Sequence, residues 1–109
     1  RLTVTGLATL ATLTLGGGTN IKKVQSGTVA ADPASIAAQT RGNVDVTITG
    51  VAVGDIVLMN PPDGLNVGLV FGGCRVTAAN TVRIYIANIS GAAIDDGSTT
   101  YDWIWFDLT

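Results

Sequence analysis

Short runs of alternating apolar and polar residues, separated by turn-forming residues, recur along most of this chain. The clearest run covers residues 43–49, where Val44, Val46 and Ile48 share one face and polar residues share the other. A period of two residues is typical of a strand buried on one side. Further strands are predicted at residues 21–31, 56–59, 67–76, 81–88 and 101–108. The pattern therefore predicts an all-β chain.

The second half of the chain predicts an antiparallel hairpin. Residues 67–76 and 81–88 have strand character, and the Thr-Ala-Ala-Asn stretch between them suits a turn. Gly72 and Gly73 interrupt the first of these strands and predict a bulge. Short strands with turns between them indicate an antiparallel β-sandwich or jelly-roll-like head, with a flattened barrel as the alternative. With the extended first twenty residues included, we expect seven or eight strands.

The connections between the strands carry turn chemistry. Residues 50–55 predict a corner, residues 60–64 (Asn-Pro-Pro-Asp-Gly) a rigid loop, and residues 90–100 a polar crossover. In residues 32–38, Asp32 suits a helix cap and Pro33 suits the first helical position. We therefore expect one helical turn in that connection.

The first twenty residues are apolar and repetitive. Residues 2–5 alternate, leucine then recurs every third residue from Leu7 to Leu13, and three glycines at 16–18 end the segment. Leu, Thr and Val in short repeats suit extended chain, yet two isolated strands are marginal in water. We expect residues 1–20 to be a shaft or anchoring segment and residues 21–109 a head domain. The alternative is that residues 2–15 form a hairpin of the main domain.

The composition favours an assembled protein. Charged residues make up 13% of the chain, against about 25% in ordinary soluble domains, and the mean hydropathy is +0.44. The apolar run at residues 56–59 ends at Asn-Pro-Pro, whereas a membrane helix needs about 20 apolar residues. The basic residues are scattered, so no nucleic-acid surface is expected. The surplus apolar surface is therefore expected to be buried between subunits, without a membrane partner.

Candidate catalytic chemistry is scarce. The chain has no His and no Glu, which removes the usual general base and most zinc sites. The adjacent Asp95 and Asp96 precede Gly97 and suit a turn, with a calcium loop as the alternative. The single Cys74 lies among strand residues and suits a buried structural thiol, with a reactive thiol or a bridge between subunits as the alternatives. We therefore expect a protein that is not an enzyme, with no catalytic residue, cofactor or metal ligand.

Aromatic residues are the remaining candidates for contact with a ligand or a subunit. On the last predicted strand one face carries three aromatic side chains and the other carries Ile104 and Phe106, so both faces are apolar. Such a strand suits a position between a facing sheet and a neighbouring subunit. Aromatic rings also stack on sugars, although core packing is their commoner role. The candidate contact residues are Tyr85, Tyr101, Trp103 and Trp105.

Four stretches of the chain are similar to a small β-domain of structural proteins in tailed bacteriophages. They are residues 32–38 (DPASIAA), 46–55 (VTITGVAVGD), 76–82 (VTAANTV) and 87–91 (ANISG). The likeness covers about residues 27–108 and rests on turn and strand signatures. In that group the domain is a capsid decoration, a head fibre or a C-terminal fibre knob.

This resemblance implies a non-enzymatic virion structural protein on the virion surface. It would be a trimeric fibre head or a capsid-decorating (cement) domain. Its partners would be its own copies, as a homotrimer, and other virion proteins such as the major capsid protein or fibre and tail proteins. The alternative is a receptor-binding adhesin head that recognises a host-surface glycan through its aromatic residues.

Overall fold

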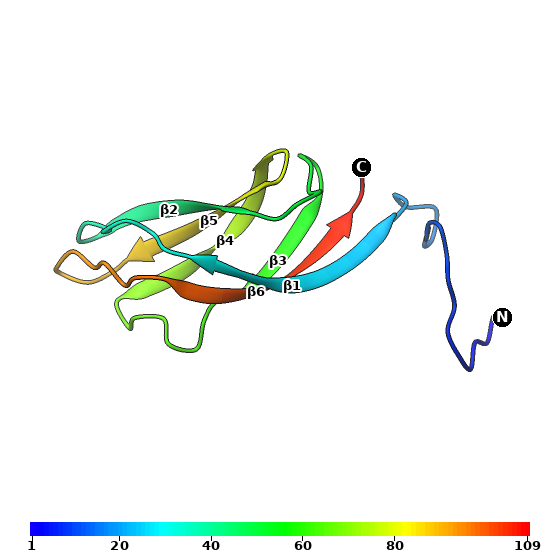
Figure 1. Ribbon diagram of the computed structural model, residues 1–109, viewed down its shortest axis with the longest axis horizontal. Coiled ribbons are helices and arrows are strands. Elements are labelled where there is room, and N and C mark those ends of the chain that lie inside the picture. The colour runs from blue at the N-terminus through cyan, green and yellow to red at the C-terminus, as the bar shows by residue number, and fades with distance from the viewer.

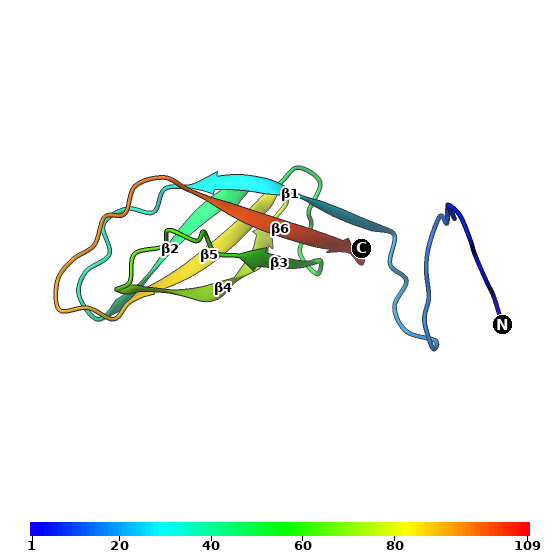
Figure 2. The ribbon, with the colours of Figure 1, turned by 90° about the horizontal axis from the view of Figure 1, so that it is seen from below.

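The chain forms a six-stranded β-sandwich without helices. The computed structural model describes residues 1–109. The strands are β1 (Lys23–Ala31), β2 (Thr40–Thr47), β3 (Ile56–Asn60), β4 (Leu69–Ala78), β5 (Thr81–Asn88) and β6 (Thr99–Asp107). They make two antiparallel three-stranded sheets, ordered β1-β6-β3 and β2-β5-β4, which lie face to face (Figures 1 and 2). The predicted all-β sandwich is confirmed, and a strand lies in each of the six regions predicted after residue 20. The additional strands expected in residues 1–20 are not formed.

The core lies between the two sheets and is built from their central strands. On β5 the alternation places Val82, Ile84 and Ile86 inward, and on β6 it places Tyr101 and Trp105 inward. These side chains are at most 1% exposed. Removing their apolar surface from water is the main favourable term in folding. The two central strands therefore supply the middle of the core, and the other four strands flank them at the sheet edges.

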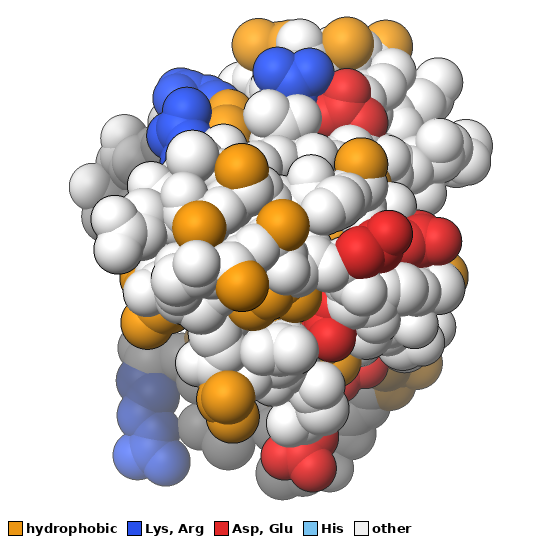
Figure 3. Space-filling model, turned by 90° about the vertical axis from the view of Figure 1, so that its left-hand side faces the viewer, with side chains coloured by type: hydrophobic (Ala, Val, Ile, Leu, Met, Phe, Trp, Pro, Cys, Tyr) orange, Lys and Arg blue, Asp and Glu red, His pale blue; other side chains and the backbone are white.

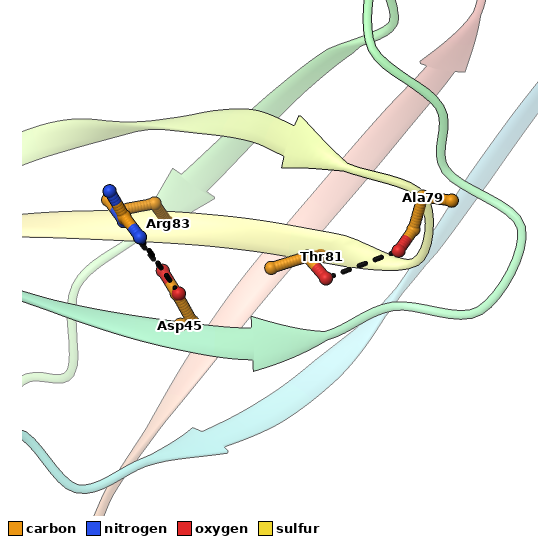
Figure 4. Close-up of polar contacts among 4 residues, drawn as sticks. All are labelled: Asp45, Ala79, Thr81 and Arg83. Carbon is orange, nitrogen blue, oxygen red and sulfur yellow. Dashed lines mark hydrogen bonds and ion pairs between the residues drawn. The ribbon is translucent and has the colours of Figure 1, made fainter.

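The predicted hairpin of β4 and β5 is present. The pairing register shifts between Phe71 and Cys74, which locates the expected bulge at Gly72 and Gly73. At the turn, Asn80 has a φ of 61°, a left-handed conformation that Asn tolerates better than most residues. The Thr81 hydroxyl donates to the Ala79 carbonyl at 3.2 Å (Figure 4). Local turn chemistry therefore closes this hairpin.

The hairpin turn is tied to the corner at residues 50–55. The Asn80 side-chain oxygen accepts a hydrogen bond from the Gly50 amide at 2.7 Å, and the Asn80 amide donates to the Val51 carbonyl at 2.9 Å. Gly50 has a φ of 102°, which only glycine adopts readily. A Cβ at this position would lie 2.9 Å from Cη2 of Trp105. The corner therefore needs glycine for both its conformation and its close approach.

Replacing Gly50 by alanine should lower the free energy of unfolding by about 2 kcal/mol, because backbone strain adds to overpacking against Trp105. The measurement is urea unfolding followed by tryptophan fluorescence. Gly64→Ala is the matched control, since nothing lies within 4 Å of its added Cβ. If the two variants were equally stable, a side chain at position 50 would cause neither backbone strain nor overpacking against Trp105.

The prediction of a helical turn at residues 32–38 is wrong, since no helix is formed there. Ile36 instead forms an isolated antiparallel bridge with Ile94, and their amides donate to each other's carbonyls at 2.9 and 3.0 Å. The buried Asn88 side chain also donates to the Ile36 carbonyl at 2.9 Å. Ile36 is 5% exposed. Burial of this side chain against the crossover outweighs the local preference of Asp32 and Pro33 for a helix start.

Residues 1–20, here called the N-terminal arm, lie outside the two sheets. None of them belongs to a named strand, and all of them are exposed. One bridge joins Leu13 to Ile21 across the glycine-rich turn, in which Gly16 and Gly17 have φ values of 60° and 76°. The arm extends from the end of the sandwich at which β1 begins and β6 ends (Figures 1 and 2).

Candidate interaction surfaces

Three of the four candidate aromatic residues lie on the inward face of β6. Tyr101, Trp103 and Trp105 share this face, as predicted, while Ile104 and Phe106 share the opposite one. Tyr101 and Trp105 are 0% and 1% exposed within the single chain. No ring face of these two residues is open to a ligand or a neighbouring subunit.

Trp103 is partly buried at the edge of the core. It pairs in register with Gly27 of β1, and a Cβ on that glycine would lie 2.7 Å from Cζ2 of the indole. The absence of a side chain at Gly27 therefore makes room for the ring. The indole nitrogen of Trp103 is buried and has no hydrogen-bond partner. Its ring contributes to packing between β1 and β6.

Trp105 is held by contacts to both its ring and its nitrogen. Its Nε1 donates to Oδ2 of Asp55 at 3.0 Å. The ammonium group of Lys23 lies 4.3 Å from the ring centroid, within the range of a cation–π contact. These contacts join β1, β6 and the corner before β3.

Asp55 is the buried acceptor at this junction. Its carboxylate also accepts hydrogen bonds from the amides of Ala52 and Leu108, both at 3.0 Å, and from the Thr109 hydroxyl at 2.9 Å. Burial alone would raise the pKa of Asp55, but the hydrogen bonds outweigh it and hold the pKa below its ordinary value. The carboxylate therefore ties the corner to the C-terminal residues and is a structural group.

Sequence reasoning placed Asp55 only at a corner and missed this role. The local signal was an Asp between Gly54 and a buried strand, which any polar turn would show. Its main side-chain partner, Trp105, lies 50 residues further along the chain. Spacing within the sequence does not reveal such a contact.

Tyr85 lies on the outward face of the other sheet. Its ring is half-buried, and the Arg41 guanidinium lies 4.9 Å from the ring centroid. Both side chains, together with Arg75, line a hollow of about 560 Å³ beside the bulge at Gly72 and Gly73. The Tyr85 ring is therefore already stacked by a residue of its own chain.

The same face carries one ion pair. Figure 4 shows Asp45 of β2 and Arg83 of β5 pointing toward each other, with N–O distances of 2.7 and 3.0 Å. The hydrogen bonds from Arg83 hold the pKa of Asp45 below its usual value. Exposed pairs of this kind contribute little to stability. They give this face a polar, mixed character.

Cys74 sits on β4 near this hollow. Its Sγ donates to the Val57 carbonyl at 3.2 Å, across the two sheets. Burial raises the pKa of the Cys74 thiol, which keeps it protonated and weakly nucleophilic. The thiol is thus placed for packing between the sheets.

The outer face of the β1-β6-β3 sheet is apolar at its centre. Val24, Phe106 and Ile56 form one row across the three strands, and Ile104 and Leu58 lie side by side in the next row. Val24, Ile56 and Leu58 are 53%, 50% and 57% exposed. We call these five residues the outer apolar face. Contiguous apolar patches on a folded domain mark interaction surfaces.

The N-terminal arm is a second apolar surface. Its leucines are exposed, with Leu7 at 95% and Leu2 at 87%. Arg1 is its only charged side chain. The arm joins the sandwich beside the outer apolar face, since Leu10 and Leu13 line a hollow together with Val24. The two apolar surfaces therefore lie next to each other at this hollow, which Lys22 and Lys23 also line.

The loops at the other end of the sandwich are mixed in character. Figure 3 views this end and shows basic side chains on one side, acidic ones on the other, and apolar groups scattered between them. In the crossover, Oδ2 of Asp96 accepts from the Asn66 amide at 3.2 Å, and Gly97 has a φ of 73°. The turn expected at Asp95, Asp96 and Gly97 is not formed: these residues lie in an irregular segment that contacts the loop before β4 through Asp96.

The polar groups form no compact reactive centre. No three His, Cys, Asp or Glu side chains come close enough together to hold a metal ion. The structure contains no helix with the length and apolar character needed to cross a membrane. No protein-family model, curated protein or solved structure matches this chain. The function is therefore inferred from the two apolar surfaces, the N-terminal arm and the outer apolar face.

Proposed function

We propose that this chain is a non-enzymatic structural subunit that associates with its own copies on the surface of a virion. In this role it is a trimeric fibre head or a capsid-decorating domain. The observation that carries the proposal is the pair of adjacent apolar surfaces, the arm and the outer apolar face. The sequence resemblance to phage structural domains supports the virion setting.

The energetics favour covering these surfaces. Burial of apolar surface contributes about 25 cal/mol per Å², and half-exposed Val24, Ile56 and Leu58 lie together on one sheet. A second copy, or another virion protein such as the major capsid protein or a fibre or tail protein, would supply that cover. The fold needs no further chain to complete its own core, so association adds to a finished domain.

The alternative, a glycan-binding adhesin head, has less support. Aromatic recognition of a sugar requires an open ring face. Tyr101 and Trp105 have none, and Arg41 stacks over Tyr85. On the outer apolar face four of the five side chains are aliphatic and only Phe106 is aromatic, which suits protein association better than sugar binding.

Replacing Leu58 by aspartate should weaken self-association about tenfold or more, equivalent to about 1.4 kcal/mol, because a charge would enter the outer apolar face. The measurement is sedimentation equilibrium at micromolar concentration, where the wild-type chain should form a trimer of its 11.1 kDa subunit. Thr47→Asp is the matched control, since it adds the same charge at an exposed position of β2.

Circular dichroism should show an intact sandwich for both variants, because Leu58 and Thr47 are exposed. A wild-type chain that remains monomeric at micromolar concentration would contradict the proposed function. If the two variants associated equally, the outer apolar face would not be part of the interface between subunits.

A further inference from the structure

The outer face of the β2-β5-β4 sheet carries three of the six basic side chains of the chain. Arg41 lies on β2, Arg83 on β5 and Arg75 on β4, all on the side away from the core. Arg75 and Arg83 are directly opposite each other in the antiparallel register. Like charges in that arrangement are destabilising. This face therefore holds a positive charge that folding by itself does not favour.

Only one of these three arginines is neutralised within the chain. Arg83 forms the ion pair with Asp45 that Figure 4 shows. The Arg41 guanidinium lies over the Tyr85 ring, a contact that uses none of its N–H donors. Arg75 has neither a carboxylate partner nor an aromatic ring beneath it. Arg41 and Arg75 therefore both lack a counter-charge.

Both unpaired guanidiniums line the hollow of about 560 Å³ beside the β4 bulge. The bulge residues Gly72 and Gly73 add no side chain here, and nothing lies within 4 Å of a Cβ placed on Gly73. Ile56 gives the hollow an aliphatic wall. Sites for small ligands have volumes of about 300–1,000 Å³ and combine apolar walls with a few polar groups. The hollow therefore has the size and lining of a site for a small organic anion.

One carboxylate also lines this hollow. It belongs to Asp55, which is 8% exposed. Its two oxygens accept hydrogen bonds from four donors of the chain: the amides of Ala52 and Leu108, the Thr109 hydroxyl and Nε1 of Trp105. Asp55 is therefore engaged by its own donors and does not neutralise the arginines. The lining keeps an excess of positive charge.

We propose that this hollow binds the phosphate group of a small organic ligand, with Arg41 and Arg75 as its counter-charges. One guanidinium satisfies a carboxylate through two parallel N–H bonds, whereas a phosphate group has three acceptor oxygens and up to two negative charges. Two unpaired arginines on one hollow therefore suit phosphate better. The contact with Tyr85 restricts the Arg41 guanidinium before binding, which lowers the cost of ordering it. Ile56 contacts the organic part of the ligand.

Titration with phenyl phosphate, which joins a phosphate group to a ring, tests the site. Amide chemical shifts of the isotope-labelled chain report where it binds. We expect saturable shifts at Gly72, Gly73 and Arg75, with a dissociation constant of about 1 mM, as for a small ligand with few contacts. Inorganic phosphate should bind more weakly because it lacks the organic part. Benzoate should also bind more weakly, because its carboxylate needs only one of the two arginines.

Arg41→Gln and Arg75→Gln should each weaken the binding of phenyl phosphate about tenfold, because each removes charge-assisted hydrogen bonds. Both side chains are exposed, so neither change disturbs the core. Arg1→Gln is the matched control, since it removes the same charge at the tip of the arm, away from the sandwich (Figure 1). The double variant Asp45→Asn/Arg83→Gln removes the neighbouring ion pair without changing the net charge. Both controls should bind like the wild type.

The outcomes decide the site and its ligand separately from the proposed function. The site would be refuted by an absence of saturable shifts at about 10 mM phenyl phosphate, ten times the expected dissociation constant. A loss of affinity in Arg1→Gln as large as in Arg75→Gln would show non-specific charge attraction and refute it too. Benzoate binding as tightly as phenyl phosphate would overturn the assignment to phosphate. A monomeric chain that bound phenyl phosphate as expected would support this inference while contradicting the proposed self-association.

Discussion

Replacing Trp105 by alanine should lower the free energy of unfolding by about 3–5 kcal/mol, the scale for truncation of a large buried aromatic residue. The indole is 1% exposed and packs between the two sheets. Its removal would leave a cavity and would deprive the Asp55 carboxylate of a donor at 3.0 Å. Chemical unfolding followed by circular dichroism measures the loss.

Trp105→Phe is the control that separates packing from hydrogen bonding. Phenylalanine keeps much of the buried volume but has no nitrogen to donate to Asp55, so its cost should be smaller than that of alanine. A Trp105→Ala chain that melted and associated like the wild type, yet failed to bind cells or glycans, would reverse the ranking of functions. Trp105 would then belong to a receptor site and the adhesin alternative would be favoured.

Local patterns were enough to predict the strands and the β4–β5 hairpin. The period of two in residues 43–49 and 81–88, with a turn at residues 77–80, depends only on neighbouring residues, and the structure has these features. The position of the bulge followed from Gly72 and Gly73 for the same reason. Each of these features is fixed by chemistry within a few residues.

Features that depend on distant partners could not be predicted. The bridge of Ile36 to Ile94 replaced the expected helical turn, and Asp55 met Trp105 across 50 residues. The candidate aromatic site shows the same limit. The alternation along β6 places Trp105 and Ile104 on opposite faces. Because both faces are apolar, the sequence does not show which of them the second sheet covers. Only the paired sheets settle that the aromatic face is the inner one.

Replacing Asp55 by asparagine should lower the free energy of unfolding by about 2–4 kcal/mol near neutral pH. The amide of asparagine would place an NH₂ group against donors that now meet a carboxylate, and buried donors left unpaired cost about 1–3 kcal/mol each. The affected donors are Nε1 of Trp105, the amides of Ala52 and Leu108, and the Thr109 hydroxyl. Asp63→Asn is the matched control, because it removes the same charge from an exposed loop residue.

The effect of Asp55→Asn should depend on pH in a defined direction. The pKa of Asp55 is lower in the folded chain than its ordinary value, so the unfolded chain takes up a proton first as the pH falls. The stabilisation from the carboxylate is therefore fully present above about pH 4. It is lost as the pH falls through the folded-state pKa.

The difference in unfolding free energy between wild type and Asp55→Asn should accordingly shrink below about pH 4. Urea unfolding at a series of pH values measures it. Asp45 also has a lowered pKa, but it is present in both chains, so its contribution cancels in the difference. A difference that stayed constant from neutral pH into the acid range would show that the Asp55 carboxylate does not hold the corner through its charge.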